Sequence, residues 1–426
     1  MTKYAIADVK ARWILDSRAN PTVETEVRTE GGTVAVAAVP SGASKGEFEA
    51  LELRDGGSAF HGLGVKKAVD NVNSIIGPKV KGMDVREQKQ IDDTMIALDG
   101  TPNKSKLGAN AVLSVSLAVA RAAALAQGMQ LHEWISKLYD RKPLLPVPFS
   151  NVLNGGEHAG NDLSIQEFMV VPVGLKTFHE ALQAVSEIYV SLRSYVTKRY
   201  GAVAKNVGDE GGVAPPMGNT QEALSALESA IADAGYSNGK EIRLAMDAAS
   251  STFFINGKYK IDGRLLTKEE LMDYWKQVIA AHKIMSIEDP FEQNDFETTA
   301  KFTAQVKPVQ VVGDDIFVTQ IARLKRGIDA GACNALLLKV NQVGSLTEAI
   351  NAGLLAIKSG YSVMVSHRSG ETTDDFIADL AVGLGTGQIK TGAPARGERV
   401  AKYNRLLKIE DDVGIPYAGP SIASKS

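Results

Sequence analysis

Residues 284–339 read IMSIEDPFEQNDFETTAKFTAQVKPVQVVGDDIFVTQIARLKRGIDAGACNALLLK and contain three short apolar runs, each ending in a charged residue. The charged residues are Glu288, Asp314 and Lys339, and a segment long enough for one helix separates each run from the next. Buried parallel strands read as continuous apolar runs, and a spacing of roughly 25 residues is close to one βα unit with a variable loop. This stretch therefore predicts consecutive βα units.

The same pattern continues on both sides of this stretch. The run Ile242 to Met246 ends in Asp247, and two later runs lead to His367 and to Lys390. In an α/β barrel the carboxyl ends of the strands form the active-site face. The sequence therefore predicts an α/β barrel in which these polar residues converge.

Each of these residues alone also has a structural explanation. Asp247 or Asp314 can cap the helix that follows it. Glu288 can belong to a turn before Asp289-Pro290, and a lysine at a strand end is usually solvated or paired with an acid. Three carboxylates, two lysines and a His-Arg-Ser triplet at consecutive strand ends are nevertheless difficult to explain as independent caps. Their conjunction favours a shared site.

The residue types in this predicted site limit its chemistry. Three carboxylates without a cysteine or histidine ligand favour a hard cation such as Mg²⁺. A lysine close to another lysine and to a dication is expected to have a lowered pKa, as a general base requires. Arg368 and Ser369 offer donors suited to phosphate. Together these groups predict proton abstraction next to a carboxylate, with the enediolate stabilised by metal charge.

The first 140 or so residues have a different pattern. Two predicted strands flank the Gly31-Gly32 turn and indicate an antiparallel hairpin, and helical patterns follow them. Strands followed by helices predict a small α+β domain, and a cluster of prolines marks a plausible boundary. We therefore predict an N-terminal α+β domain at residues 1–140 and a barrel domain at 141–426. The strands are 22–28 and 33–39, the helices 64–76, 84–98 and 107–127, and the prolines Pro143, Pro146 and Pro148.

Composition excludes several classes of function. The 426 residues carry a formal net charge of -3 without a basic cluster, which argues against nucleic-acid binding. The most apolar stretch, Leu113 to Ala126, contains Arg121 and is shorter than the roughly 18 residues that span a bilayer. The single cysteine, Cys333, is expected to be buried and fits a reducing compartment. We therefore expect a cytoplasmic protein without a membrane or nucleic-acid partner.

Seven blocks of sequence closely resemble enolase motifs, and they occur in the family's order over essentially the whole chain. The segment Leu336–Glu348 (LLLKVNQVGSLTE) resembles the enolase signature. The other blocks are DSRANPTVE from Asp16, PSGAS from Pro40, IQEFM from Ile165, GDEGG from Gly208, SHRSGET from Ser366 and KTGAP from Lys390.

The resemblance implies a fold and a reaction. The fold is an N-terminal α+β domain capping an irregular enolase-type TIM-like β/α barrel, which begins with two strands and two helices before the regular βα units. The reaction is the interconversion of 2-phosphoglycerate and phosphoenolpyruvate plus water, with two Mg²⁺ per active site. The resemblance also implies a homodimer or an octamer of dimers, and a small-molecule substrate.

Site residues follow from the resemblance by position. Lys339 removes the C2 proton, and Glu210, with Glu167 close by, protonates the departing C3 hydroxyl. Mg²⁺ ligands are Asp247, Glu288 and Asp314 for the first ion and Ser41 for the second. Substrate-binding residues are His158, Gln166, His367, Arg368, Ser369 and Lys390.

Some positions depart from the family's pattern, although none of them carries a role in the implied chemistry. Ala19 stands where glycine is common, Lys45 where threonine is common and Val213 where phenylalanine is common. The glycine-bearing loops around Ser41 and His158 are expected to close over the substrate. Lys45 lies close to Ser41, so loop closure or the affinity for the second metal can differ.

Other classes of protein fit less well. A Rossmann dehydrogenase lacks its Gly-x-Gly-x-x-Gly, because Gly62-Leu63-Gly64 has no third glycine, and the phosphate-loop motif of NTPases is absent. A racemase or cycloisomerase of the same superfamily would share the metal triad but normally lacks the phosphate site and the Glu167/Glu210 arrangement. A non-catalytic scaffold would not need Lys339 or Glu210, and both are present.

Overall fold

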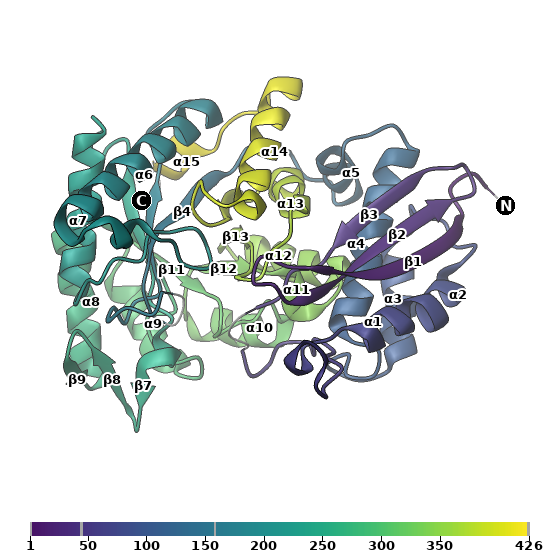
Figure 1. Cartoon of the computed structure of the whole chain (residues 1–426), viewed down its shortest axis with the longest axis horizontal. Helices are drawn as coiled ribbons and strands as arrows, with labels where there is room; N and C mark the ends of the chain where they lie inside the picture. The colour runs from purple at the N-terminus through teal and green to yellow at the C-terminus, as the bar shows by residue number, and fades with distance from the viewer. Residues whose placement is uncertain (1, 43–45, 157–158, 424–426) are drawn as a thin grey trace.

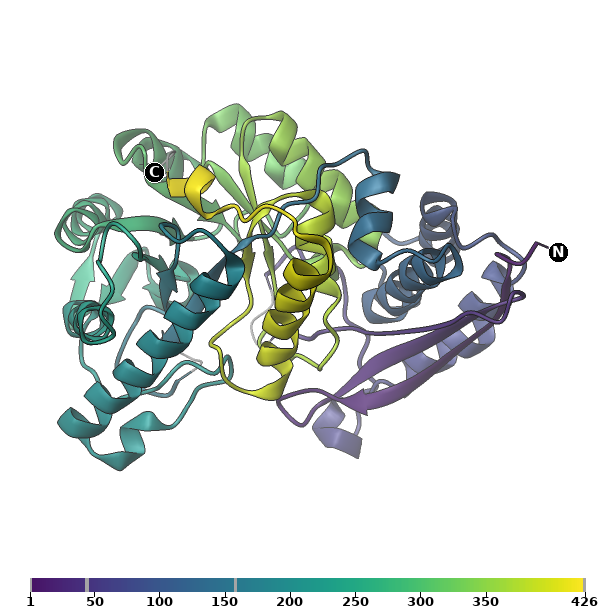
Figure 2. The same cartoon turned by 90° about the horizontal axis from the view of Figure 1, so that it is seen from above.

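The computed structural model describes residues 2–42, 46–156 and 159–423. A three-stranded sheet with helices forms the N-terminal part, and a closed barrel of eight strands forms the rest (Figure 1). Figure 2 shows the same division from above, with the N-terminal strands on one side of the molecule and the barrel on the other. The predicted fold class, an α+β part followed by an irregular β/α barrel, is confirmed.

The N-terminal sheet has the order β1-β2-β3, and all its neighbours are antiparallel. The predicted hairpin corresponds to β2 and β3, whereas β1 was not predicted from the sequence. Polar residues such as Lys10 and Arg12 alternate with buried ones along β1, as expected for a strand with one face on a core. The elements are β1 (Ile6–Leu15), β2 (Pro21–Thr29), β3 (Val34–Ala38), α1 (Lys66–Asn71), α2 (Gly77–Val80), α3 (Gln88–Asp99), α4 (Ala109–Ala126) and α5 (Leu131–Leu138).

Helix α4 is the central helix of the N-terminal part and packs on β2 and β3. It has 18 residues and is therefore longer than the apolar stretch Leu113 to Ala126 considered in the sequence. By length and composition alone it is long and apolar enough to cross a membrane. Because 83% of it is buried inside the fold, it is better explained as a core helix.

The barrel closes in the strand order β10-β11-β12-β13-β14-β4-β5-β6. Six of its strands end where the apolar runs in the sequence predict a strand end. The barrel begins irregularly, because β5 is antiparallel to both β4 and β6 and two helices precede β6. The irregular start implied by the family resemblance is thus confirmed. The strands are β4 (Val147–Asn154), β5 (Glu167–Val171), β6 (Arg243–Asp247), β10 (Ile284–Glu288), β11 (Gln310–Gly313), β12 (Ala335–Leu338), β13 (Ser362–Ser366) and β14 (Gly387–Lys390).

Helices surround the barrel, and several begin at a polar N-cap. Thr267 caps α8 with a capping box, since its hydroxyl accepts the N–H of Glu270 and the Glu270 carboxylate accepts the N–H of Thr267. The helices are α6 (Phe178–Tyr200), α7 (Thr220–Asp233), α8 (Lys268–His282), α9 (Phe296–Gln305), α10 (Ile321–Ala330), α11 (Val340–Val343), α12 (Leu346–Lys358), α13 (Phe376–Leu384), α14 (Gly397–Val413) and α15 (Gly419–Ala423). A small hairpin sheet of β7 (Phe254–Ile255), β8 (Lys258–Ile261) and β9 (Arg264–Leu266) lies between β6 and α8.

The predicted domain boundary between residues 140 and 141 falls in the segment that joins α5 to β4. It stays a prediction. Cys333 is buried, as expected from the sequence.

Two of the three departures from the family's pattern lie within the described residues. Ala19 has a φ of 59°, in the left-handed region that glycine occupies without strain, so alanine there costs about 1 kcal/mol. Val213 is fully buried, and it donates its N–H to Val152 of β4. Lys45 lies outside the described residues.

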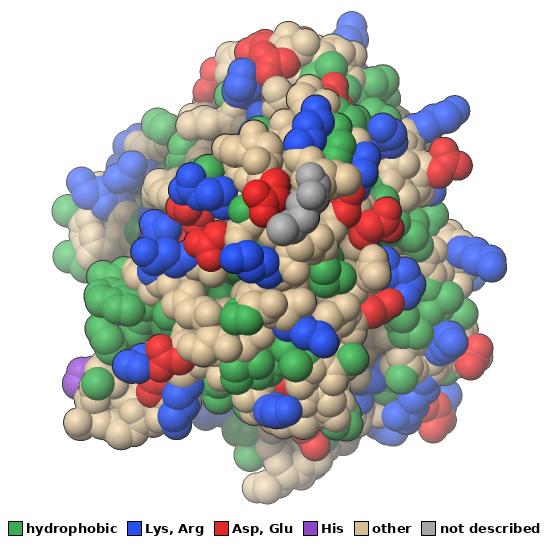
Figure 3. Space-filling model, turned by 90° about the vertical axis from the view of Figure 1, so that its right-hand side faces the viewer, with side chains coloured by type: hydrophobic (Ala, Val, Ile, Leu, Met, Phe, Trp, Pro, Cys, Tyr) green, Lys and Arg blue, Asp and Glu red, His purple; other side chains and the backbone are tan. Residues whose placement is uncertain are grey.

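The face at the N-terminal end of the molecule carries mixed charge. Figure 3 shows lysine and arginine side chains interspersed with aspartate and glutamate over this face. Such interspersed charges form no broad basic surface on the face shown.

Candidate active site

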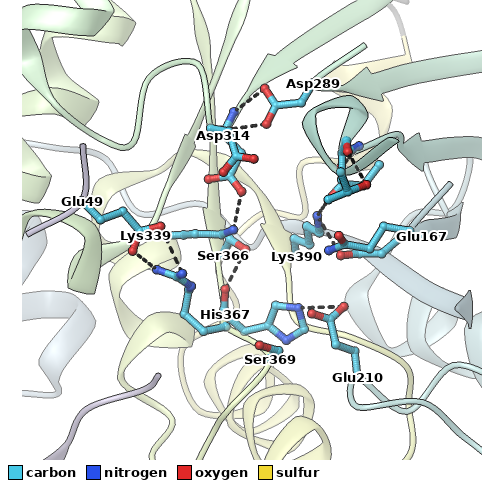
Figure 4. A pocket seen from close by; sticks show the side chains of 16 residues that line it. Glu49, Glu167, Glu210, Asp289, Asp314, Lys339, Ser366, His367, Ser369 and Lys390 are labelled. Carbon is cyan, nitrogen blue, oxygen red and sulfur yellow. Dashed lines mark hydrogen bonds and ion pairs between the residues drawn. The ribbon is translucent and has the colours of Figure 1, made fainter. Parts of the chain in front are cut away.

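A cavity opens at the carboxyl end of the barrel strands. Its lining includes ten of the thirteen predicted site residues (Figure 4). Strand ends far apart in the sequence therefore do converge, as the barrel pattern predicted. The predicted residues in the lining are Gln166, Glu167, Glu210, Asp247, Asp314, Lys339, His367, Arg368, Ser369 and Lys390.

Two other predicted residues, both in the described part of the chain, are not among those that line the cavity. Glu288 is buried directly behind it, bonded to Lys390. Ser41 lies beside it, because its N–H and C=O pair with the backbone of Gly370, one residue after Ser369. His158 lies outside the described residues.

Strand register places three of the carboxylates side by side. Glu167 of β5 and Glu288 of β10 are both paired in register with Asp247 of the strand between them, β6. Because β5 is antiparallel to β6, its first residue and not its last lies at this end of the barrel. The reversed strand thus explains how Glu167 joins the carboxylates that end β6 and β10.

Lys390 is the cation at the centre of this group. Its Nζ lies 2.9 Å from the Asp247 carboxylate, 3.0 Å from that of Glu288 and 3.1 Å from that of Glu167. Burial lowers the pKa of Lys390, but these carboxylates outweigh burial and raise it well above its usual value. Lys390 is therefore a positive charge in the site of the metal-free protein.

Lys339 pairs with the remaining predicted metal ligand. Its Nζ lies 2.5 Å from Asp314 Oδ2, while Gln342 Nε2 donates to Asp314 Oδ1 at 2.8 Å. Burial, Arg368 and Lys390 lower the pKa of Lys339, whereas Asp314 and Glu288 raise it. The raising effects are the larger, so the net shift is upward. The lowering expected from the sequence assumed a dication beside Lys339, so it stays a prediction for the metal-bound protein. Without a metal, Asp314 pairs directly with the ammonium group.

Glu167 and Glu210 form a pair of buried carboxyl groups. Burial, and then the charge of Glu210, raise the pKa of Glu167 well above its usual value, although Lys390 opposes the shift. Asn151 Nδ2 donates to Glu210 Oε2 at 3.0 Å and fixes that carboxyl group. Repulsion between the two carboxyl groups favours the protonated form of one of them, which is the property that a general acid needs.

His367 is held as a neutral ring beside Glu210. Its Nε2 lies 3.6 Å from Glu210 Oε2, and Arg399 Nη1 donates to its Nδ1 at 2.7 Å. A guanidinium group only donates, so Nδ1 accepts and the ring proton is on Nε2, facing Glu210. Burial and Arg399 together lower the pKa of His367 to about 3, against the opposing effect of Glu210.

We therefore expect His367 to stay neutral in the folded protein from pH 8 down to pH 5. The unfolded state binds a proton near pH 6.5, so this residue subtracts stability as the pH falls below that value. Nitrogen-15 NMR of labelled imidazoles should show one ring that keeps the Nε2–H form throughout this range. His367→Gln identifies its signals, and a ring that titrates near pH 6.5 would contradict the expectation.

Arg368 and Ser369 follow β13 and form another wall of the cavity. The Arg368 guanidinium contacts both oxygens of Glu49, with Nη1–Oε2 at 3.0 Å and Nη2–Oε1 at 3.2 Å. Arg399 of α14 donates to the backbone C=O of both Arg368 and Ser369 at 2.6 Å. This buried arginine fixes the loop that carries the predicted phosphate donors.

The carboxylate oxygens of the cavity fit a hard cation such as Mg²⁺. Burial and Asp247 raise the pKa of Glu288 well above its usual value, and burial and Asp314 raise that of Asp315 to about 7. Carboxylates thus outweigh the positive charge around them, a situation that a dication relieves. The predicted ligands Asp247, Glu288 and Asp314 fit this role.

A second group of acids within the described residues also has ligand-like geometry. Oxygen atoms of Asp289, Asp314 and Asp315 all lie within 4.8 Å of one another. Asp289, however, uses its two oxygens to accept the backbone N–H groups of Asp314 and Asp315, at 3.1 and 2.7 Å. Its observed role is to shape the turn that presents Asp314.

Four residues of the site's surroundings were missed from sequence. They are Glu49, Asn151, Asp289 and Arg399, and all but Glu49 act through a neighbouring residue. Asp289 stands in the quoted run but was considered only as part of an Asp289-Pro290 turn, whereas its carboxylate fixes the turn after the next strand, at Asp314 and Asp315. The other three lie outside the strand-end pattern, which therefore gave no signal for them.

Family models match nearly the whole chain. Residues 6–135 match the model of the enolase N-terminal domain, and residues 142–426 match that of the enolase C-terminal TIM barrel domain. Enolase from Methanopyrus kandleri is 57% identical over 419 residues, which cover 97% of this chain and 98% of the relative. Enolase from Methanocaldococcus jannaschii is 54% identical over 418 residues, with 98% of each covered. Enolase from Pyrococcus furiosus is 54% identical over 421 residues, covering 98% and 97%.

The barrel and its buried group of carboxylates and lysines define an α/β-barrel enzyme with its site at the carboxyl ends of the strands. Together with the two matched domains, they agree with the resemblance seen in the sequence motifs. The chain belongs to the enolase family and is a hydro-lyase.

Proposed function

We propose that this enzyme interconverts 2-phosphoglycerate and phosphoenolpyruvate plus water, using two Mg²⁺ per site. The observation that supports it best is the placing of Lys339 and of the Glu167/Glu210 pair in one buried cavity, on different sides of it (Figure 4). Elimination of water needs a base for one carbon and an acid for the hydroxyl of the next. The cavity offers both.

Lys339 is the base in this proposal and takes the C2 proton. In the enolase superfamily a lysine or histidine base works with one or two Mg²⁺ ions. Asp247, Glu288 and Asp314 would hold one Mg²⁺ and Ser41 would help hold the other. When bound, these ions would supply positive charge that stabilises the enediolate and would add to the counter-charge of the carboxylates. Once Asp314 has another cation, it no longer raises the pKa of Lys339 to the same extent.

Glu210 is the acid and gives its proton to the departing C3 hydroxyl. The C2 proton goes to Lys339, the C3–O bond breaks, and the hydroxyl leaves as water with the proton of Glu210. Glu167 supports this role, because a shared proton keeps one member of the pair protonated near neutral pH. Lys390, which stays charged beside these carboxylates, helps to neutralise the enediolate.

The remaining predicted residues bind the substrate. Arg368 and Ser369 bind the phosphate, for which the forked guanidinium of Arg368 is well suited. Gln166 and neutral His367 line the reacting end, and we include His158 from the family's motif. Gln166 is positioned by its backbone, whose N–H donates to the Asp247 carbonyl at 3.1 Å.

Conversion of 2-phosphoglycerate by the purified protein tests the proposal. We expect the ultraviolet absorbance of the conjugated product to rise with Mg²⁺, to stop with excess EDTA and to return when Mg²⁺ is restored, because the enediolate is poorly compensated without the metal. Circular dichroism of the EDTA-treated protein controls for unfolding. A folded, Mg²⁺-loaded protein without turnover would refute this function and favour another reaction of the superfamily.

We also propose that the protein assembles as a homodimer or an octamer of dimers and acts in the cytoplasm on a small-molecule substrate alone. Family resemblance supports the assembly, and the absence of a basic cluster in the sequence supports the lack of a nucleic-acid partner. Light scattering coupled to size exclusion measures the mass and separates the two assemblies.

A further inference from the structure

Glu49 binds the arginine that the proposed function assigns to the substrate phosphate. Both carboxylate oxygens of Glu49 face the two terminal nitrogens of Arg368, at 3.0 and 3.2 Å (Figure 4). The exposed fractions of these side chains are only 9% and 5%. This is a buried bidentate pair, the strong form of an arginine–carboxylate contact.

Glu49 belongs to the N-terminal part of the chain, far in sequence from Arg368. Its own segment holds it in place, since the N–H of Gly46 donates to Oε1 at 3.1 Å. The N–H of Ala50, the next residue, donates to the backbone C=O of Gln342 in α11 at 2.8 Å. Glu49 is thus fixed on both sides and is not a surface acid that happens to reach the cavity.

Phe48 anchors the same segment to the barrel. The Arg323 guanidinium lies over the Phe48 ring, 4.2 Å from its centroid, and Gln320 donates to the Phe48 carbonyl. A cation–π contact of this kind attracts the ring to the guanidinium group. The segment is therefore docked on the barrel independently of the ion pair.

A phosphate group and a carboxylate compete for the same face of a guanidinium. Bidentate recognition uses two parallel N–H donors, and Glu49 engages one donor from each terminal nitrogen of Arg368. Nη1 also donates to Asn341 Oδ1 at 3.0 Å, which leaves this nitrogen with two acceptors. A phosphate that approaches this fork meets a negative charge of the protein at the place where its own oxygens would bind.

We propose that Glu49 is an internal competitor of the substrate phosphate, which must displace its carboxylate from Arg368. The proposal rests on the phosphate-binding role of Arg368 in the proposed function. Glu49 then sets the affinity for the phosphate group: it keeps Arg368 paired in the free enzyme and lowers the affinity for every phosphate-bearing ligand. Loss of the carboxylate charge strengthens phosphate binding.

A merely positioning role for Glu49 predicts the opposite sign. If the pair only held the Arg368 side chain in the rotamer that binds phosphate, removing its charge would loosen Arg368 and weaken binding. The direction of the change in phosphate affinity therefore decides between competition and positioning.

Calorimetric titration of inorganic phosphate into the full-length, Mg²⁺-loaded protein tests the proposal. We expect Glu49→Gln to lower the Kd for phosphate by about 5- to 10-fold, as removal of a like charge next to a bound anion does. Glu47→Gln is the matched control, because it removes the same charge from an exposed side chain two residues away and should leave the Kd unchanged. The double variant Glu49→Gln/Arg368→Gln should lose the gain.

An unchanged or raised Kd in Glu49→Gln would overturn the proposal, and so would a gain that persists without Arg368 or that Glu47→Gln reproduces. Absence of phosphate binding in every variant would also overturn it. Thermal unfolding of each variant verifies that it is folded. Phosphate binding is measured without turnover, so a protein that binds phosphate as expected but fails to convert 2-phosphoglycerate refutes the proposed function alone.

Discussion

Replacement of Lys339 by alanine should lower kcat by about 10⁴-fold, the upper range of what a general base contributes. Lys339 reaches the cavity from the end of β12 and contacts Asp314, so it is positioned to take a proton there. Its loss leaves the other lysine, Lys390, enclosed by three carboxylates that keep it protonated. Lys390 cannot take over as the base.

Exchange of the C2 proton with deuterated solvent separates this step from the loss of hydroxyl. We expect both exchange and turnover to disappear in Lys339→Ala, because both require removal of the C2 proton. Lys325→Ala, which removes an exposed lysine of α10, is the control and should keep full activity. Removing one partner of a buried pair can also destabilise the fold, so Lys339→Gln, which keeps a donor for Asp314, serves as a second variant. Normal exchange in either folded variant would rule out Lys339 as the base.

The strand ends of the barrel could be predicted because two independent constraints act on the same residues. A buried parallel strand must be apolar along its length, and the residue after it must be polar when it faces a site. Asp247, Glu288, Asp314, Lys339 and Lys390 satisfy both constraints, and the structure brings them together. Their convergence required no knowledge of loops or helices.

Glu167 is a site residue that the pattern of strand ends could not predict. It is the first residue of β5, and only the antiparallel direction of that strand brings it beside Asp247. The apolar pattern of a strand is the same in either direction, so the sequence pattern alone cannot assign it to the active-site end. The motif resemblance supplied this residue instead.

The pairing of charged side chains could not be predicted from the sequence either. Spacing predicted that Lys339 and Asp314 would be near each other, but not that an ion pair would raise the pKa of Lys339 above its usual value. Glu49 likewise does not follow a barrel strand, so the pattern of strand ends could not predict it. It reaches Arg368 from a different part of the fold. Contacts of a few ångströms depend on side-chain positions that periodicity does not determine.

Replacement of Glu210 by glutamine should separate the two halves of the reaction. We expect turnover to fall by about 10²–10⁴-fold, since the departing hydroxyl loses its proton donor. Exchange of the C2 proton should continue, because Lys339 and Asp314 are untouched by the change. Glutamine keeps an oxygen that can accept from Asn151, so the carboxamide can occupy the place of the carboxyl group. Rapid-quench measurement of exchange and absorbance measurement of product give the two rates on the same sample.

The persistence of exchange is what distinguishes an acid from a structural residue. A folding defect or a displaced substrate would lower exchange and turnover together, whereas loss of the acid lowers turnover alone. Asp209→Asn removes the neighbouring negative charge, which pairs with Arg18 outside the cavity, and should leave both rates near those of the unaltered enzyme. If Glu210→Gln abolished exchange as fully as Lys339→Ala does, Glu210 would belong to the proton-abstraction step, and Glu167 would become the candidate for the acid.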